Sequence, residues 1–241
     1  MLPALGLGLY ETSTTGAQAR IGIPFTDIDS ITIGGGYEDT TITAFEGAPL
    51  PDVVRKTAIH LLVANAGIAS SAPIEETTLA LWNKNMDILS TGYFLVSREA
   101  FKLFRAQSIG GAVVFIASKN GLAASPNAAA YCTAKAAEIH LARCLALEGA
   151  EAGIRVNVVN PDAVLKGSKI WSGEWLDQRA STYGKDKDGL EEMYRQRSML
   201  KRSVLPEDIA EGAYFFASDL SAKSTGNILN VDAGNVQAFT R

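Results

Sequence analysis

From residue 59 to its end, the chain alternates short apolar runs with longer amphipathic or alanine-rich stretches. Continuous apolar runs are typical of parallel strands that are covered on both faces. We predict strands at 59–64, 111–118, 154–160 and 227–232, and helices at 77–107, 127–149 and 206–218, the first of them broken near 90–92. Strands alternating with helices predict an α/β fold, a Rossmann-like doubly wound parallel sheet in a single domain.

Residues 1–58 do not follow this pattern. They contain β-prone fragments at 20–25, 30–33 and 40–45, and only 52–58 is a candidate for a short helix. A Gly34-Gly35-Gly36 run is interpreted as a turn between two short strands, because paired glycines favour turns. We therefore divide the chain into an atypical or incomplete N-terminal portion, 1–58, and a core, 59–241.

The window 166–202 lies between a predicted strand and a predicted helix. It has nine Lys/Arg against six Asp/Glu, and it holds all but one of the chain's three tryptophans. A connection of this length is usually functional or disordered, and its aromatic residues favour a partly ordered lid over the substrate. The alternative is an amphipathic insertion that only packs on its own domain.

Composition limits the classes of function. The chain is 47% hydrophobic and 20% charged, which is enough apolar material for a buried core. Its 22 Lys/Arg against 26 Asp/Glu give a net charge of −4, so no basic excess is present to neutralise the phosphates of a nucleic acid. The apolar runs are too short to span a bilayer, and no membrane association is expected.

The two cysteines, Cys132 and Cys144, lie in one predicted helix, about 18 Å apart and too far for a disulfide. With only two histidines besides, no metal site is expected. A reducing, cytoplasmic location is the simplest interpretation. The alternative is a secretory signal, since residues 1–9 are apolar and Ala17-Gln18-Ala19 resembles a cleavage site, but the stretch lacks positive charge and is interrupted by proline and glycine.

The candidate chemistry lies at Ser118, Tyr131 and Lys135. Tyr131 and Lys135 are four residues apart and share one helix face. A nearby ammonium favours the phenolate, and a tyrosine shifted in this way can act as general acid and base between an alcohol and a carbonyl. Ser118 ends a buried strand at the carboxyl edge, where ligands bind in open α/β sheets, and can donate a hydrogen bond to the substrate oxygen.

These residues belong to a series of motifs that resembles the short-chain dehydrogenase/reductase family from about residue 61 to residue 235. Besides the three residues above, the matching pieces are Asn65-Ala66-Gly67, Tyr131-Cys132-Thr133-Ala134-Lys135, Arg155-Val156-Asn157 with Asn160-Pro161, Ser224-Thr225-Gly226 and Val231-Asp232-Ala233-Gly234.

The resemblance implies hydride transfer with NAD or NADP, of which NAD is preferred here. It implies that Tyr131 is the acid/base, that Ser118 orients the substrate oxygen, and that Lys135 binds the nicotinamide ribose and lowers the Tyr131 pKa. Asn65, Ala66 and Gly67 would line the adenosine side of the cofactor, and Val164 would meet its carboxamide. The implied cofactor-binding residues are Asn65, Ala66, Gly67, Tyr131, Lys135, Pro161 and Val164.

Two further stretches narrow the resemblance. Residues 160–171 and 82–89 are similar to the dehydrogenase part of bifunctional rhamnulose-1-phosphate aldolase/short-chain dehydrogenase proteins. This implies rhamnose catabolism and a small hydroxyaldehyde such as lactaldehyde as substrate. As in most members of the family, a homodimer or homotetramer is expected, formed through residues 91–104 and 127–149.

The chain departs from the family at the helix that precedes Tyr131. Many members place a catalytic asparagine at the position that is Leu89 here, and a leucine cannot hold the water that relays protons from the active-site lysine. Asn85 lies one turn earlier, about 6 Å away. We interpret Asn85 as an ordinary helix-surface residue, because asparagine is a poor helix former and its neighbours are of exposed type.

The larger departure is the phosphate-binding loop. The family begins with a strand, Thr-Gly-x-x-x-Gly-x-Gly and a helix whose N-terminus holds the pyrophosphate, and residues 1–64 contain no such motif. Asp39 lies roughly where the family has an acidic residue facing the adenine. Either the N-terminal portion is an atypical, truncated or rearranged version, or cofactor binding is impaired. The rival function is therefore a catalytically silent scaffold or binding subunit.

Overall fold

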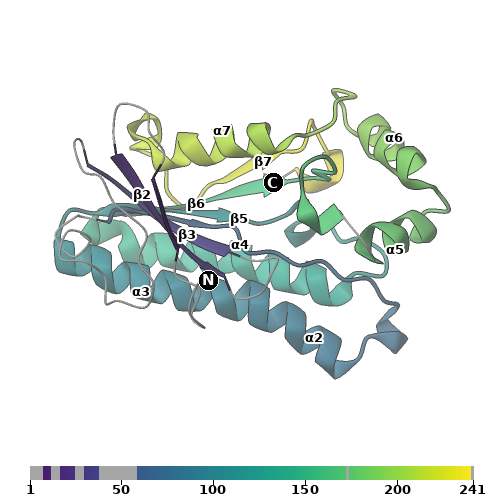
Figure 1. Ribbon diagram of the computed structural model, residues 1–241, viewed down its shortest axis with the longest axis horizontal. Coiled ribbons are helices and arrows are strands. Elements are labelled where there is room, and N and C mark those ends of the chain that lie inside the picture. Colours follow the sequence, from purple (N-terminus) through teal and green to yellow (C-terminus); the bar gives the residue numbers. More distant parts are fainter. Residues whose placement is uncertain (1–7, 12–16, 25–29, 38–58, 172–173, 240–241) are drawn as a thin grey trace.

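The computed structural model describes residues 8–11, 17–24, 30–37, 59–171 and 174–239. They form one seven-stranded sheet in the order β1-β2-β3-β4-β5-β6-β7 (Figure 1). The parallel part consists of β4 (Leu61–Ala64), β5 (Gly111–Ile116), β6 (Ile154–Pro161) and β7 (Ile228–Val231). The predicted α/β fold and its four strands are confirmed.

Helices cover both faces of the parallel strands, so side chains alternate between two cores. Val113 and Phe115 pack in the core on the side of α3 (Gly92–Gln107) and α4 (Ala129–Gly149). Val114 and Ile116 pack on the opposite side, beneath α7 (Pro206–Ala217). Figure 1 shows the sheet between these two layers. This two-sided burial is the reason that the strands read as continuous apolar runs.

The N-terminal strands pair in antiparallel fashion, unlike β4 to β7. The strands β1 (Gly8–Glu11), β2 (Ala17–Pro24) and β3 (Ser30–Tyr37) form an antiparallel meander, and β3 pairs antiparallel with β4. The glycine run 34–36 lies inside β3, so its interpretation as a turn is wrong; the extended backbone there is satisfied by pairing with β2. Asp39 and the fragments 40–45 and 52–58 lie outside the described residues.

The predicted long helix is a composite. It consists of α2 (Leu79–Asn85), a π-helical turn η2 (Met86–Thr91) and α3, so the expected break near 90–92 is confirmed. The Thr78 hydroxyl caps the start of α2 by accepting from the Leu81 N–H. Single π-helical turns inside longer helices occur frequently at functional sites.

The window 166–202 is helical. It contains α5 (Glu174–Thr182) and α6 (Lys187–Arg197), which pack together beyond the carboxyl ends of the parallel strands (Figure 1). Short 3₁₀ turns occur at η1 (Ile74–Glu76), η3 (Lys119–Gly121), η4 (Ala150–Ala152), η5 (Lys169–Trp171), η6 (Asp219–Ser221) and η7 (Val236–Ala238). Within the described ranges, no helix combines the length and apolar character needed to cross a membrane.

Candidate active site

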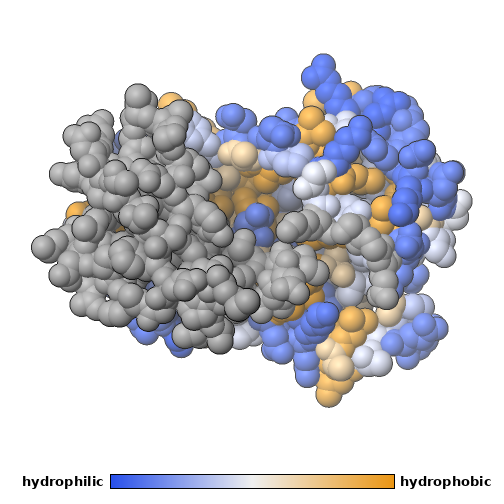
Figure 2. Space-filling view, in the orientation of Figure 1, coloured by the Kyte–Doolittle hydropathy of each residue, from blue (hydrophilic) through white to orange (hydrophobic). Residues whose placement is uncertain are grey.

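A cavity of about 370 Å³ lies at the carboxyl ends of β4, β5 and β6. Every residue that the sequence predicted for catalysis or cofactor binding lines it, namely Asn65, Ala66, Gly67, Ser118, Tyr131, Lys135, Pro161 and Val164. On its far side the cavity is bounded by residues of α5 and α6, whose outer surface is mostly hydrophilic (Figure 2). Residues that are 70 positions apart in the sequence are thus gathered at one sheet edge.

Tyr93 holds two of the strand ends together. Its hydroxyl lies 3.1 Å from the carbonyl oxygen of Ala66 and 3.0 Å from that of Ile116, so it bridges the ends of β4 and β5. The Tyr93 ring packs edge-on against Phe115 with 4.9 Å between ring centroids. The sequence analysis did not single out Tyr93, because its role depends on which strands become neighbours.

Tyr131 lies in the first turn of α4 and is only 7% exposed. Burial raises its pKa above the ordinary value, a hydrogen bond with the Ser118 side chain acts in the opposite direction, and the charge of Glu138 raises the pKa further. The Ser118 hydroxyl also accepts a hydrogen bond of 3.2 Å from the Asn120 N–H, which fixes its position. The two hydroxyl groups therefore meet in the cavity, and Tyr131 carries its proton at neutral pH.

Lys135 is held by Glu138, a residue that the sequence analysis missed. The ammonium lies 3.0 Å from the Glu138 carboxylate and 3.3 Å from the carbonyl oxygen of Ile116. Both side chains are buried, and burial raises the pKa of Glu138 to about 8 although Lys135 opposes this. The lowered Tyr131 pKa that the resemblance implied is not seen, because desolvation of the phenol dominates.

The interpretation of Asn85 as a surface residue is wrong. Asn85 is fully buried, and its amide donates to the Ser70 hydroxyl and to the Leu81 carbonyl, both at 2.8 Å. It therefore fastens the segment that follows Asn65-Ala66-Gly67 to α2. Leu89 is also fully buried and packs against Tyr131 and Ala134, where it contributes an apolar wall beside the tyrosine.

The aromatic residues of the window 166–202 close the cavity. Trp175 lies with its ring centroid 6.0 Å from that of Tyr131 and 5.9 Å from that of Trp171. Tyr194 of α6 packs edge-on against Trp171 at 5.5 Å. All three of these window residues line the cavity, so the window forms its wall opposite the sheet.

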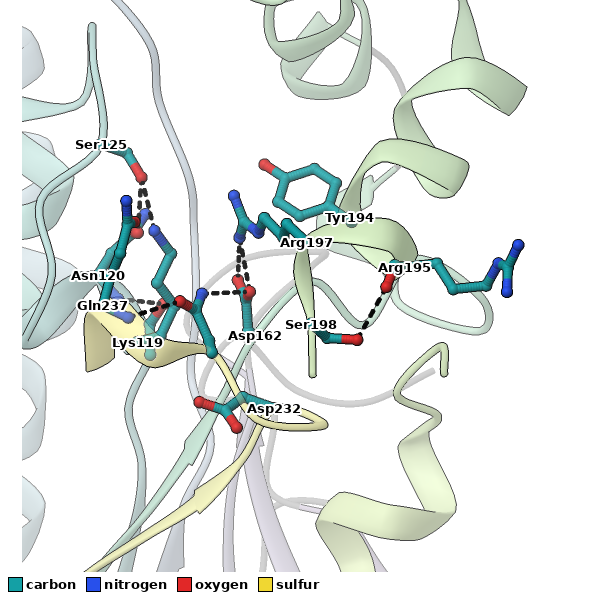
Figure 3. A network of polar contacts seen from close by, with 12 residues as sticks. Lys119, Asn120, Ser125, Asp162, Tyr194, Arg195, Arg197, Ser198, Asp232 and Gln237 are labelled. Carbon is teal, nitrogen blue, oxygen red and sulfur yellow. Dashed lines mark hydrogen bonds and ion pairs between the residues drawn. The ribbon is translucent and has the colours of Figure 1, made fainter. Parts of the chain in front are cut away.

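A polar network borders the cavity beneath α6 (Figure 3). The Arg197 guanidinium donates to both carboxylate oxygens of Asp162, at 2.7 and 2.6 Å, and the Asn235 amide donates to Asp162 at 2.9 Å. On its other side, the Lys119 ammonium donates to the Ser125 hydroxyl at 3.0 Å. Asp162 replaces the glycine usual in the family after Pro161, and its ion pair ties α6 to the end of β6.

The direction of β3 determines which part of a dinucleotide the described residues can hold. In the Rossmann order the strand beside β4 carries the glycine-rich loop at its carboxyl end. Here Thr32 of β3 pairs with Val63 in antiparallel register, so the amino end of β3 lies at the cavity edge. The carboxyl end of β3 therefore lies away from the cavity, and β3 does not deliver a pyrophosphate loop to that edge.

Comparison with known proteins agrees with this geometry. Residues 52–235 match the family model described as Enoyl-(Acyl carrier protein) reductase. A crystal structure of the sorbitol-6-phosphate 2-dehydrogenase SrlD from Erwinia amylovora is similar with a TM-score of 0.70 and 35% identity, over 73% of this chain and 68% of that one. The chain belongs to the short-chain dehydrogenase/reductase family.

Two other members of this family extend the comparison. The uncharacterized oxidoreductase YuxG of Bacillus subtilis is 52% identical over 204 residues, which are 85% of this chain but only 29% of YuxG. A gluconate 5-dehydrogenase from Burkholderia cenocepacia, solved with NADP and tartrate, is 25% identical with a TM-score of 0.66, over 77% of this chain and 68% of that one. None of these relatives is named as a rhamnulose-1-phosphate aldolase/dehydrogenase protein. That narrower resemblance therefore stays a prediction.

Proposed function

We propose that this short-chain dehydrogenase/reductase interconverts an alcohol and a carbonyl on a small hydroxyaldehyde or sugar-derived substrate, with NAD or NADP as cofactor. The observation that carries the proposal is the convergence of Ser118, Tyr131 and Lys135 in one cavity together with the strand-end residues expected to bind the cofactor. Members of the family bind NAD(P), and several relatives are named for sugar alcohols or their phosphates. Lactaldehyde remains one candidate substrate.

The cofactor would supply the hydride acceptor or donor. Tyr131 and Lys135 would bind its nicotinamide ribose, Val164 after the end of β6 would meet its carboxamide, and Asn65, Ala66 and Gly67 after the end of β4 would line its adenosine side. Gly67 fits this role, because a Cβ at that position would lie 3.1 Å from Ile170 and would narrow the cavity. The two free cysteines, Cys132 and Cys144, support a reducing, cytoplasmic location.

The chain's own residues perform the proton chemistry. In the reducing direction, the Tyr131 hydroxyl donates its proton to the substrate oxygen while Ser118 donates a hydrogen bond to the same oxygen. In the oxidising direction, the Tyr131 oxygen takes the proton back. Lys135 would hold the nicotinamide ribose beside Tyr131, as the family resemblance implies. Trp171 and Trp175 keep water from the reacting atoms.

Titration with NAD and NADP tests the proposal. A ligand at 100 times its dissociation constant stabilises a protein by about 2.7 kcal/mol, so one nucleotide is expected to raise the melting temperature measurably and to quench tryptophan fluorescence through Trp171 and Trp175. ADP-ribose serves as a control that lacks the nicotinamide. Absence of any shift at millimolar NAD and NADP would favour the alternative function, a catalytically silent scaffold or binding subunit.

That alternative has specific support. The antiparallel direction of β3 and the leucine at position 89 remove two features that most active members use. Against it, the buried Lys135–Glu138 pair and the buried Tyr131 hydroxyl carry a desolvation cost that a purely structural protein has no need to retain.

We expect the window 166–202 to act as a substrate lid. Closing segments exclude water during hydride transfer, and this one carries Trp175 over Tyr131. Hydrogen exchange should show amides of residues 175–183 that are more protected when nucleotide and substrate are bound together than in the free protein. Equal exchange rates in both states would mean that the window is a fixed structural insertion.

We also expect self-association through α3 and α4. Phe94 and Leu103 of α3 and Leu147 of α4 are exposed by 46%, 37% and 82%, which leaves apolar side chains uncovered on these helices. Burial of such side chains between two copies would favour a symmetric dimer or tetramer. Sedimentation at micromolar concentration should reveal it, whereas a single 25.6 kDa species would contradict it.

A further inference from the structure

Two buried cations line the cavity without a carboxylate partner in the described part of the chain. Lys119 is 3% exposed and its ammonium donates to the neutral Ser125 hydroxyl. Arg179 of α5 is 1% exposed and donates to the Pro126 carbonyl at 2.9 Å and to the Tyr183 hydroxyl at 2.7 Å. A buried charge that has only neutral partners is costly, so the pair needs a separate explanation.

Two other cations of this region, the buried Lys135 and the half-buried Arg197, differ because each has its own carboxylate. Lys135 pairs with Glu138, and Arg197 pairs with Asp162. Asp162 also attracts Lys119 at longer range, but its carboxylate is occupied by Arg197 and by the Asn235 amide. The positive charge of Lys119 and Arg179 is therefore not balanced by the carboxylates that the structure describes around the cavity.

Two side chains that line the same cavity carry N–H groups without a hydrogen-bond acceptor among the described residues. The Nε of Arg179 and the Nε1 of Trp175 are buried and have no acceptor among the described residues, although both side chains line the cavity. Buried donors are normally satisfied. A cavity that combines two cations with unsatisfied N–H groups is suited to a ligand that brings several acceptor oxygens and negative charge.

Lys119 and Arg179 also contact the same short segment of the chain. They contact consecutive residues, since Lys119 binds Ser125 and Arg179 binds the carbonyl of Pro126. Burial lowers the pKa of Lys119 most strongly, the charge of Asp162 raises it, and the charges of Arg197 and, more weakly, Arg179 lower it. Figure 3 shows the Lys119 side chain directed at Ser125, next to the Arg197–Asp162 pair. A bound anion would relieve this repulsion.

The ring of Trp175 lies between Arg179 and Tyr131. The Arg179 guanidinium stacks over Trp175 at 5.3 Å from the ring centroid, and Trp175 packs against Tyr131. Lys119 directly follows Ser118 in the chain. Its side chain extends away from the Ser118 hydroxyl and toward Ser125. Both cations therefore belong to the same cavity as Ser118 and Tyr131.

We propose that the cavity selects substrates that carry an anionic group, a phosphate monoester or a carboxylate, at the end remote from the reacting carbon, and that Lys119 and Arg179 bind this group. The proposal rests on the proposed function and deepens it by naming the substrate class. A hydroxylated chain of a few carbons would connect the two ends, with its alcohol at Ser118 and Tyr131 and its anion between the two cations.

Anion binding and substrate turnover together test the proposed role of Lys119 and Arg179. Inorganic phosphate and succinate are titrated against the protein while its melting temperature is followed, without any nucleotide. D-sorbitol 6-phosphate, D-gluconate and unphosphorylated D-sorbitol are then compared as substrates. We expect phosphate or succinate to stabilise the protein, and the corresponding anionic substrate to have a kcat/KM at least tenfold above that of sorbitol. The more effective anion identifies which of the two groups the substrate carries.

The variant Lys119→Met should lose the stabilisation by the anion and raise KM for the anionic substrate by about 10- to 100-fold, as expected for a hydrogen bond to a charged group. Arg179→Lys keeps the charge and should show a smaller loss. The matched control is Lys223→Met, which removes an exposed lysine and should leave both readouts unchanged. Circular dichroism verifies that each variant is folded.

The outcomes separate this proposal from the proposed function. Turnover of neutral and anionic substrates with equal kcat/KM, together with no anion stabilisation, would overturn the anion site while the dehydrogenase function stands. Anion stabilisation that depends on Lys119 in a protein that binds neither NAD nor NADP would support the anion site and refute the dehydrogenase function. An anion effect that persists in Lys119→Met would also overturn the assignment.

Discussion

Replacement of Tyr131 by phenylalanine is expected to lower kcat by about 10²–10⁴-fold, because the variant removes the group that exchanges a proton with the substrate oxygen. The phenyl ring keeps its contacts with Leu89, Ala134 and Trp175. The free energy of unfolding should change by only about 1 kcal/mol, since one hydrogen bond with Ser118 is lost while a buried hydroxyl disappears. Steady-state kinetics and chemical denaturation measure the two effects.

Tyr214→Phe is the matched control for this variant. Tyr214 is 64% exposed on α7, far from the cavity, and its hydroxyl should be dispensable for turnover and for stability. A loss of less than about tenfold in Tyr131→Phe would show that another group transfers the proton. Because burial raises the Tyr131 pKa, oxidation of the alcohol should accelerate with rising pH, whereas reduction of the carbonyl should not.

Replacement of Lys135 by methionine should give the second large effect, on stability as well as on turnover. The variant leaves Glu138 fully buried without its counter-ion. Above pH 8, where Glu138 is ionised in the folded protein, removing its buried partner should cost about 3–5 kcal/mol. Turnover should fall by a factor comparable to that of Tyr131→Phe, because the proposed mechanism assigns the nicotinamide ribose to Lys135.

The stability loss in Lys135→Met should depend on pH. Burial raises the pKa of Glu138 to about 8 from an ordinary value of 4.5, so the folded protein holds this proton more tightly than the unfolded chain. Stability from this group is therefore complete below pH 4.5 and declines as the pH rises toward 8. Without Lys135 the Glu138 pKa rises further, so the decline should extend to higher pH, and in Glu138→Gln it should be absent.

The double variant Lys135→Met/Glu138→Leu separates stability from chemistry. Apolar side chains in place of a buried ion pair are often neutral or stabilising, so the double variant should recover most of the stability that Lys135→Met loses. Its turnover should stay as low as that of the single variant. If both single variants and the double variant had equal stability at pH 9, the Lys135–Glu138 contact would have no energetic importance.

Much of the parallel core could be predicted from the sequence, because strands covered on both faces and helices with clear ends leave strong local patterns. The motif residues Ser118, Tyr131 and Lys135 could be recognised as candidate site residues from their spacing in the sequence. The antiparallel direction of β3 could not be predicted, since pairing partners and strand direction are set by contacts distant in the sequence. The glycine run in β3 shows how tertiary pairing overrides a local preference for turns.

The missed residues of the site share one physical reason. Glu138 lies three residues after Lys135 on the same face of α4, but α4 is rich in alanine and its buried face is not marked by a strong apolar stripe. Arg179 lies on a helix whose sequence is polar, and only the fold shows that it is buried beside Trp175. Charged residues are read as exposed by default, so buried charges are recognised only when their environment is known.

The bridge made by Tyr93 has a consequence for how specificity in this protein can be changed. A single phenol fixes the distance between the backbones at Ala66 and Ile116, so the cofactor side and the Ser118 side of the cavity behave as one rigid frame. The wall contributed by α5 and α6 lies outside this frame and is attached through side chains such as Arg179 and Arg197. Attempts to widen the substrate range by directed evolution should therefore collect productive changes in residues 170–194, whereas changes at the strand ends should mostly cost activity.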